Sequence, residues 1–261
     1  MSDLIKVKSS SYSRYEELLI KRDQYEREVE SILISYTKEF GELTALIFEK
    51  KIECIRLKKT IAYCQAAINR GELVDIGAVN DRLEIEMTVY RAQLDDMLKQ
   101  NQKARDSKSV SIIDIEHAKR IYRRLARKLH PDINPQTATT PELSDIWNRV
   151  VIAYKMLDPK EMTELEVLAN KIIEQFGLET IEVEIPDIEE RIVLLEEEIH
   201  NLITTEPYTY TDILEDPEKT GAHREKLQND LNETEQYCSS LEKTLHELLG
   251  KGDVTNRWRM N

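Results

Sequence analysis

Apolar residues along most of the chain recur at steps of three and four, the spacing that places side chains on one face of an α-helix. The first such series runs from Tyr15 to Phe40 and is interrupted by Gly41. A second runs from Leu43 to Ile68 and stops at residues 69–71, where a glycine can take the left-handed conformation of a helix end. A third is expected to begin near Asn80, with an inner face of Val79, Leu83, Met87, Tyr90, Leu94 and Met97. The three series predict an antiparallel helical bundle or hairpin.

Residues 101–111 are polar and lack this periodicity, so they predict a frayed helix end and a linker into a new unit. The helix that follows is expected to use Asp114 as its N-cap and to end at Pro131, because proline disfavours the helical conformation in the residue before it. Its apolar stripe comprises Ile115, Ala118, Tyr122, Leu125 and Leu129. Residues 133–141 have the composition of a loop. A return helix is expected next, with an apolar stripe of Leu143, Trp147, Val150, Tyr154 and Leu157.

Three further helices are predicted in the remainder of the chain. Residues 162–176 form an amphipathic series closed by Gly177. A seam of Ile185, Ile188, Ile192, Leu195, Ile199 and Leu202 is separated by the loop 204–222 from a second seam of Leu227, Leu231, Thr234, Cys238, Leu241, Leu245 and Leu248. The two arms have similar lengths, which favours an antiparallel hairpin over two independent dimer zippers. Between residues 182 and 198 there are eight acidic residues and one basic residue, so the first arm should carry an anionic outer face.

Composition agrees with a chain made of long helices. Only 7 Gly and 7 Pro occur, while charged residues make up 33% of the chain. We therefore predict an all-α fold in three consecutive parts: an N-terminal helical coiled-coil or bundle region (1–107), a central helical hairpin region (112–177) and a C-terminal antiparallel coiled-coil hairpin (182–250).

The formal net charge is −13 and the isoelectric point about 5.0, a balance that repels nucleic acid and anionic membranes. No apolar run reaches the roughly 18 residues typical of a membrane span, and the N-terminus lacks the apolar core of a secretory signal. We expect a cytoplasmic protein without a membrane segment. Cys54, Cys64 and Cys238 fall on apolar helix positions without metal-ligand spacing, so we expect reduced thiols packed as small hydrophobic side chains.

Residues with the spacing of known catalytic or metal sites are missing from the sequence. The five histidines stand singly, and none pairs with a cysteine or another histidine at zinc-ligand spacing. The sequence contains no nucleophile elbow and no glycine-rich phosphate loop. Paired carboxylates are background in a chain with 50 acidic residues. We expect no enzyme activity and no cofactor.

One segment departs from the acidic character of the chain. Residues 115–132 contain six basic and two acidic residues. A nucleic-acid contact would also need side chains that reach base edges, and a net-basic domain, and the segment offers neither. A solvated basic face and a docking surface for an acidic partner remain as the other interpretations.

The residues around this segment match a pattern across two helices. Lys119, Tyr122, Arg123, Arg124, Leu125 and Ala126 occupy a Lys-x-x-Tyr-Arg/Lys-Arg/Lys-Leu-Ala pattern and precede the triplet His130-Pro131-Asp132. The return helix contains Trp147, Ala153-Tyr154, Leu157 and Asp158-Pro159-Lys160. Residues 113–161 together resemble the J domain of DnaJ-type co-chaperones. In that family, phenylalanine is usual at the position of Trp147.

The resemblance implies two antiparallel helices with a His-Pro-Asp loop at their tip and a basic helix that docks on a DnaK-type (heat-shock protein 70) chaperone. The docking residues that it implies are Lys119, Tyr122, Arg123, Arg124, Arg127, His130, Pro131 and Asp132. Charge complementarity fits a transient partner interface, because it speeds encounter and fixes orientation more than it adds affinity. The other interpretation of the triplet is a helix-terminating turn in which Asp132 bonds its own backbone.

The sequence also departs from the family. The usual first helix is absent before Ile112, so another helix must cover that side of the hairpin, and residues 79–98 or residues 162–176 could do so. A Gly/Phe-rich segment and a cysteine zinc repeat are missing as well, which makes the chain similar to class C members, here with flanking coiled coils.

Three functions follow as expectations. The first is a co-chaperone that stimulates the ATPase of a DnaK-type chaperone. The second is a coiled-coil scaffold whose hairpin no longer stimulates the chaperone, and the third is a nucleic-acid-associated protein. A client or scaffold protein bound by the coiled-coil arms, and a homodimer, are left open as further partners.

Overall fold

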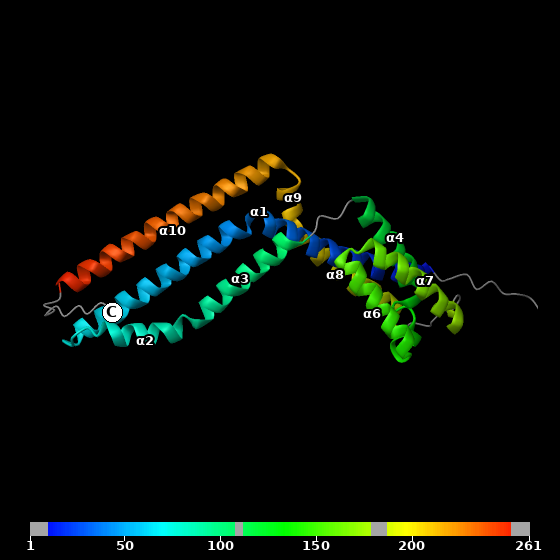
Figure 1. Cartoon of the computed structure of the whole chain (residues 1–261), viewed down its shortest axis with the longest axis horizontal. Helices are drawn as coiled ribbons and strands as arrows, with labels where there is room; N and C mark the ends of the chain where they lie inside the picture. The colour runs from blue at the N-terminus through cyan, green and yellow to red at the C-terminus, as the bar shows by residue number, and fades with distance from the viewer. Residues whose placement is uncertain (1–9, 108–111, 179–186, 252–261) are drawn as a thin grey trace, which may run out of the picture. The chain divides into compact units, whose positions relative to one another are not determined.

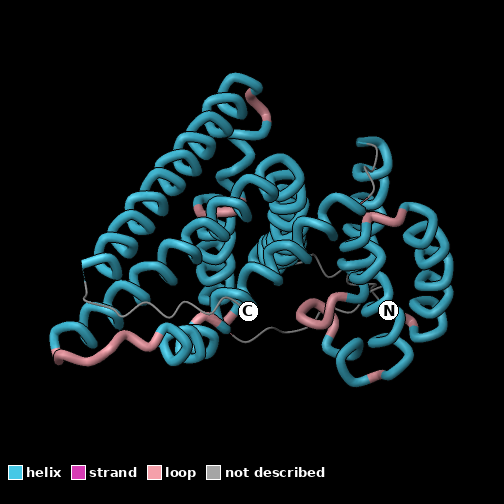
Figure 2. Tube along the Cα trace, turned by 60° about the vertical axis from the view of Figure 1, so that its left-hand side comes forward, coloured by secondary structure: helices cyan, strands magenta, loops and turns pink. Residues whose placement is uncertain are grey.

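A computed structural model describes residues 10–107, 112–178 and 187–251, and within these ranges the chain is almost entirely helical, with no strand (Figure 2). The elements, labelled in Figure 1, are α1 (Ser10–Asn69), α2 (Ile76–Glu86), α3 (Thr88–Asp106), α4 (Ile112–Leu129), α5 (Pro135–Thr139), α6 (Pro141–Met156), α7 (Pro159–Phe176), α8 (Ile188–Thr204), the short 3₁₀ helix η2 (Tyr208–Tyr210), α9 (Thr211–Leu214) and α10 (Pro217–Lys251). The predicted all-α fold class is confirmed.

The helices form two compact units, each built from segments that are distant in sequence. The first unit comprises Met1–Leu33 and Lys108–Thr209, and the second comprises Ile34–Ser107 and Tyr210–Asn261. The long helix α1 contributes its N-terminal part to the first unit and its C-terminal part to the second.

In the first unit, α4, α6 and α7 enclose one hydrophobic core. Every predicted apolar position of α4 and α6 contributes to this core, with Ile115 partly buried at its edge. Helix α7 packs against both α4 and α6 and adds Met162, Leu165, Ala169 and Ile173. Of the two segments considered for covering the hairpin, residues 162–176 therefore do so, whereas residues 79–98 belong to the other unit.

Local sequence explains where the helices of this core end. Leu157 ends α6 in the left-handed conformation (φ 48°), and the Asp158 carboxylate accepts hydrogen bonds from the backbone N–H groups of Lys160 and Glu161 at the start of α7. Gly177 closes α7 with φ 64°, as predicted. The prediction that Asp114 caps α4 is wrong, because α4 begins at Ile112 and Asp114 lies in its first turn.

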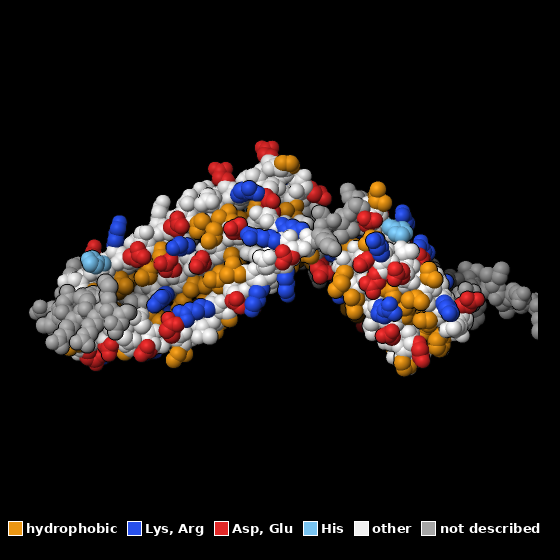
Figure 3. Space-filling view, in the orientation of Figure 1, with side chains coloured by type: hydrophobic (Ala, Val, Ile, Leu, Met, Phe, Trp, Pro, Cys, Tyr) orange, Lys and Arg blue, Asp and Glu red, His pale blue; other side chains and the backbone are white. Residues whose placement is uncertain are grey.

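In the second unit, the C-terminal part of α1 packs between α3 and α10 (Figure 1). On the α10 side, the Tyr36 hydroxyl lies 2.9 Å from His223 Nε2, and the Cys54 thiol lies 3.6 Å from the backbone oxygen of Thr234. All three cysteines are buried free thiols, so that prediction is confirmed. Hydrophobic side chains run in rows between charged ones on the face of this unit drawn in Figure 3.

The third predicted helix is in fact two helices. Asp75 caps α2 through the backbone N–H of Ala78, so the helix starts at Ile76 rather than near Asn80. A break at Met87 then separates α2 from α3. Helix α3 continues to Asp106, so residues 101–106 are the expected helix end, and residues 108–111 lie outside the described ranges.

The predicted pairing of the two C-terminal arms with each other is wrong for the described residues, and Ile185 lies outside them. Ile192 and Leu195 of α8 are buried against Tyr15 and neighbouring residues in the first unit. Helix α10 belongs to the second unit, where it packs on the C-terminal part of α1. Both arms carry apolar seams, but α1 supplies the partner surface for each of them.

Helix α1 does not stop at Gly41, contrary to the prediction. The Asn101 side chain of α3 donates a hydrogen bond to the Gly41 carbonyl at 2.7 Å, and a Cβ at position 41 would lie 2.3 Å from Asn101 Oδ1. Glycine inside a helix costs about 1 kcal/mol relative to alanine. Here it allows a helix approach that a side chain would block.

This contact predicts that the effect of Gly41→Ala depends on Asn101. In wild type, the gain in helix propensity should be offset because Asn101 must move and lose its hydrogen bond, worth about 1 kcal/mol. In an Asn101→Ala background the same substitution should stabilise by about 1 kcal/mol. Urea unfolding of the four chains measures this coupling, and additive effects would contradict the contact.

Within the described ranges, no helix is both long enough and apolar enough to cross a membrane.

Candidate functional site

The hairpin of α4 and α6 presents residues 130–132, here called the tip, at its connecting end. Ring contacts pair residues late in α4 with residues early in α6. Tyr122 stacks on Tyr154 at 4.1 Å, whereas His130 meets Trp147 edge-on at 5.2 Å. The two helices therefore run antiparallel, and the connection between them contains the tip.

Contacts around His130, which is only 7% exposed, hold the tip in place. Its Nδ1 accepts a hydrogen bond from the backbone N–H of Asp132 at 3.2 Å. The neutral ring must then carry its proton on Nε2, which lies 3.5 Å from Asp23 Oδ2 of α1. His130 is therefore fixed from three sides, while the side chain of Asp132 remains 49% exposed.

Asn134 fastens the chain after the tip, a role that the sequence analysis missed. Its side-chain nitrogen donates to the Lys128 carbonyl at 3.0 Å, and its side-chain oxygen accepts from the Gln136 backbone at 3.1 Å. The second bond caps α5, which lies within the predicted loop and has Pro135 at its first position. An asparagine directly before a proline is the signal that could have revealed this cap.

One face of α4, here called the basic face, carries Lys119, Arg123 and Arg127 at steps of four, so their side chains point the same way. Tyr122 lies beside this face and is buried in the hydrophobic core. Arg124 lies off this face and pairs with Glu166 of α7 at 2.6 Å.

Residues 12–28 of α1, here called the covering segment, lie along the basic face in antiparallel order. The contacts are Tyr12 hydroxyl to Ile133 carbonyl (3.4 Å), Glu16 to Arg127 (3.5 Å), Asp23 to Tyr122 (2.6 Å), Gln24 to Arg123 (2.9 Å) and Glu28 to Lys119 (3.0 Å). Early residues of the covering segment meet late residues of α4, and the reverse. The contact therefore extends from the end of the tip to the middle of α4.

Asp23 lies at the centre of this contact, with a side chain only 11% exposed. Burial alone would raise the pKa of its carboxyl group. Hydrogen bonds from His130, Tyr122 and Arg22 outweigh burial, so the pKa of Asp23 is lowered from its ordinary value. The same burial and the neighbouring carboxylate raise the pKa of the Tyr122 hydroxyl. The carboxylate thus stays charged beneath the tip, and Tyr122 stays a hydrogen-bond donor to it.

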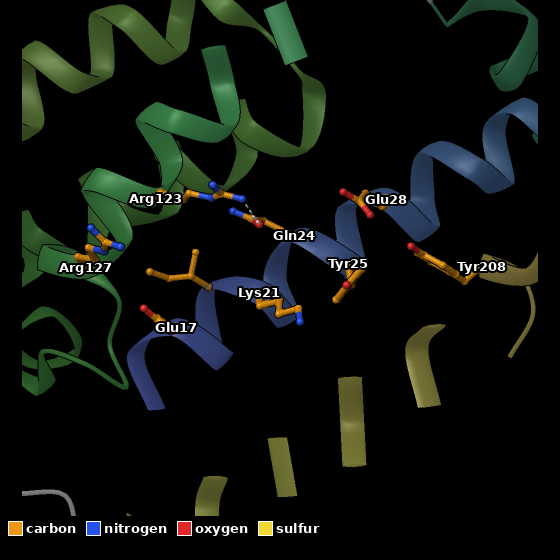
Figure 4. Close-up of a pocket in the computed structure, with 9 residues that line it drawn as sticks. Glu17, Lys21, Gln24, Tyr25, Glu28, Arg123, Arg127 and Tyr208 are labelled. Atoms are coloured by element: carbon orange, nitrogen blue, oxygen red, sulfur yellow. Dashed lines mark hydrogen bonds between the residues drawn. The ribbon is translucent and has the colours of Figure 1, made fainter. Parts of the chain in front are cut away.

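A cleft of about 530 Å³ lies beside the covering segment and α4 (Figure 4). Arg123 and Arg127 enter it from α4, and Figure 4 shows the Arg123 guanidinium bonded to Gln24. The lining also includes Lys21 and two carboxylates, so charges of both signs are present. Such a lining suits contact with a polar protein surface better than it suits an apolar small molecule.

The contact between the covering segment and the hairpin leaves several buried polar atoms unsatisfied. Gln24 Nε2, Arg27 Nη1 and the Tyr154 hydroxyl have no hydrogen-bond partner among the described residues. Each unsatisfied buried group costs about 1–3 kcal/mol. The covering segment is therefore held by specific pairs but at a free-energy cost.

The eight docking residues implied by the sequence resemblance lie on α4 and in the tip that follows it, but they do not share one face of the helix. Five of them contact the covering segment: Lys119, Tyr122, Arg123, Arg127 and His130. Arg124 and Asp132 are exposed, and Pro131 is half-buried. The acidic residues of α1 were not predicted, because single carboxylates carry no signal in a chain this acidic.

Within the described ranges, no group of His, Cys, Asp or Glu side chains could hold a metal ion. The site consists of charged and hydrogen-bonding groups on a rigid helical hairpin, an arrangement that can bind a protein surface. No match to the chain was found among protein-family models, curated proteins or solved structures.

Proposed function

We propose that this chain is a J-domain co-chaperone of the class C type. It docks on a DnaK-type (heat-shock protein 70) chaperone through α4 and the tip and stimulates ATP hydrolysis by that chaperone. The chain has flanking helices and no Gly/Phe-rich segment in its sequence, and in this it differs from a full DnaJ.

The construction of the tip carries the proposal. A turn that only ended a helix would not require His130 to be clamped by Trp147 and Asp23, with its Nδ1 bonded to the Asp132 backbone. These contacts fix the backbone of Asp132 while its side chain stays 49% exposed, and Arg124 and Arg127 of α4 have side chains that are 54% and 56% exposed. Exposed guanidinium groups on a rigid helix suit an acidic partner surface.

A second candidate is a helical scaffold in which the hairpin does not stimulate the chaperone. Contact between the covering segment and five of the eight docking residues favours this alternative, because a docking surface must be reachable. The two candidates make opposite predictions for one ATPase measurement.

We expect the wild-type chain in molar excess to raise the steady-state ATPase rate of a purified DnaK-type chaperone, and His130→Gln to abolish the increase. Glutamine cannot reproduce the ring contact with Trp147 or the acceptor for the Asp132 backbone. His117→Gln, on the same helix but outside the tip, is the matched control and should stimulate like wild type. Circular dichroism at the assay temperature checks that each variant is folded, and equal rates from wild type and His130→Gln would favour the scaffold.

A further inference from the structure

The covering segment contacts five of the eight residues that the proposed function assigns to the chaperone. Its acidic and amide groups meet the basic face at Glu16, Gln24 and Glu28, and Asp23 accepts a hydrogen bond from Tyr122 beside that face. A partner that recognised the same cations would have to place carboxylates or other acceptors at the same points. The covering segment and such a partner cannot both make these bonds.

We propose that the covering segment is an intramolecular competitor that occupies the basic face of α4 until it is displaced. The proposal rests on the co-chaperone function and concerns its regulation. Two sets of observations support it independently. The first is the extent of the overlap, which runs from Ile133, directly after the tip, to Lys119.

The second set of observations is the cost of the closed arrangement. Gln24, Arg27 and Tyr154, at or beside the covering segment, each bury a polar atom that has no protein hydrogen-bond partner among the described residues. A permanent core contact would satisfy such atoms, because each one left unpaired costs free energy. Displacement of the covering segment from α4 would return these polar atoms to solvent. Their hydration would offset part of the free energy lost with the broken hydrogen bonds, so the closed and open forms stay close in free energy.

The covering segment makes mainly polar contacts with α4. Within the core shared with α4, α6 and α7, the covering segment contributes only Ile20, whereas α7 contributes four buried side chains. Its other buried apolar residues, Tyr12, Tyr15 and Leu19, form a second cluster with α8 and Ile133. The hairpin thus keeps most of its own core when the covering segment moves away.

Glu28→Lys tests the proposal because it replaces the partner of Lys119 with a like charge at the end of the contact, away from the tip. The Glu28 side chain is 35% exposed, so the substitution places no new group in a packed core. A switching contact of this kind is typically worth about fivefold or more. We therefore expect Glu28→Lys at sub-saturating concentration to stimulate a DnaK-type chaperone at least about fivefold more than wild type, and His130→Gln in the same background to remove the gain.

Glu166→Lys is the matched control for the added positive charge. Glu166 pairs with Arg124 of the same helix α4 from α7, and its side chain is 21% exposed. It does not belong to the covering segment, so this substitution should raise stimulation far less. Equal gains from the two variants would show that charge alone improves docking and would overturn the competitor proposal.

Hydrogen exchange of wild type gives a test that does not depend on a variant. If the covering segment must leave, adding the chaperone should accelerate exchange of the amides in residues 12–28. Stimulation with unchanged or slower exchange there would overturn the competitor proposal while the co-chaperone function stands. Equal stimulation by wild type and Glu28→Lys would also overturn the competitor proposal. If His130→Gln then abolished stimulation in both chains, the co-chaperone function would stand. Absence of stimulation from every chain would overturn the co-chaperone function and its regulation together.

Discussion

Replacing Trp147 with alanine is expected to lower the free energy of unfolding by about 3–5 kcal/mol, the range typical of a buried tryptophan. The Trp147 residue is 7% exposed and its ring contacts Tyr122 at 5.7 Å and His130 at 5.2 Å. The cavity left behind would lie directly beneath the tip. We therefore expect a loss of stability together with a loss of order at His130. Urea unfolding followed by far-ultraviolet circular dichroism measures the stability change without relying on tryptophan fluorescence.

Two further substitutions give this experiment its reference points. Trp147→Phe keeps an aromatic ring against His130 and should cost less than half as much as alanine. Ile152→Ala removes a side chain of α6 that is 53% exposed, and such surface changes usually stay within about 0.5 kcal/mol. A loss below about 1 kcal/mol in Trp147→Ala would mean that the ring does not support the tip.

Local patterns were sufficient to predict the helices of the central region. The stripe from Leu143 to Leu157 is buried at every predicted position, and Gly177 closes α7 as expected. These features depend on residues within one or two turns of each other, where periodicity and capping rules apply directly. The missed helix α5 is a local failure, since Asn134 and Pro135 together form a recognisable helix start.

Contacts between distant segments could not be predicted in the same way. Gly41 was interpreted as an interruption of the helix, but α1 continues through it, and the close approach of Asn101 from another helix explains why a glycine suits this position. The apolar seams of α8 and α10 were correctly recognised as seams, but a seam does not identify its partner. Periodicity describes one helix at a time, so it could not predict that α8 and α10 both pack against α1.

The covering segment shows the same limit at the candidate site. The predicted apolar series of α1 omitted Glu16, Gln24 and Arg27, which are all buried. These polar residues are buried because other helices pack against more than one side of α1. Burial along α1 therefore does not follow a single stripe. The basic face could be predicted because its charges stand out in an acidic chain, whereas the opposing carboxylates could not.

Replacing Asp23 with asparagine should lower the free energy of unfolding near neutral pH by about 1.5–3 kcal/mol, the range for hydrogen bonds to a charged group. Asparagine can still accept the Tyr122 hydroxyl, but it removes the charge that faces His130 and the Arg22 guanidinium, 2.8 Å away. Arg22 keeps weaker contacts with other carboxylates, at 3.9 and 4.0 Å. The loss should therefore fall short of the cost of a fully isolated buried charge.

The pH dependence of this loss identifies the charge as its cause. The folded pKa of Asp23 is lowered relative to the ordinary value of 3.8, so the folded chain releases this proton more readily than the unfolded chain. The stabilisation is then fully present above the ordinary pKa and is lost as the pH falls through the lowered value. We expect the stability difference between wild type and Asp23→Asn to be constant from about pH 7 to 5 and to shrink below about pH 4.

Asp145→Asn provides the comparison, because Asp145 is an exposed aspartate on α6. Its effect should stay within about 0.5 kcal/mol at every pH. Urea unfolding of the three chains at a series of pH values measures both differences, and effects shared by all other carboxylates cancel when each variant is compared with wild type. A difference for Asp23→Asn that stayed constant down to pH 3 would show that the carboxylate charge does not hold the covering segment and the tip together. A difference that vanished with the charge would tie the stability of this contact to the same carboxylate that fixes His130.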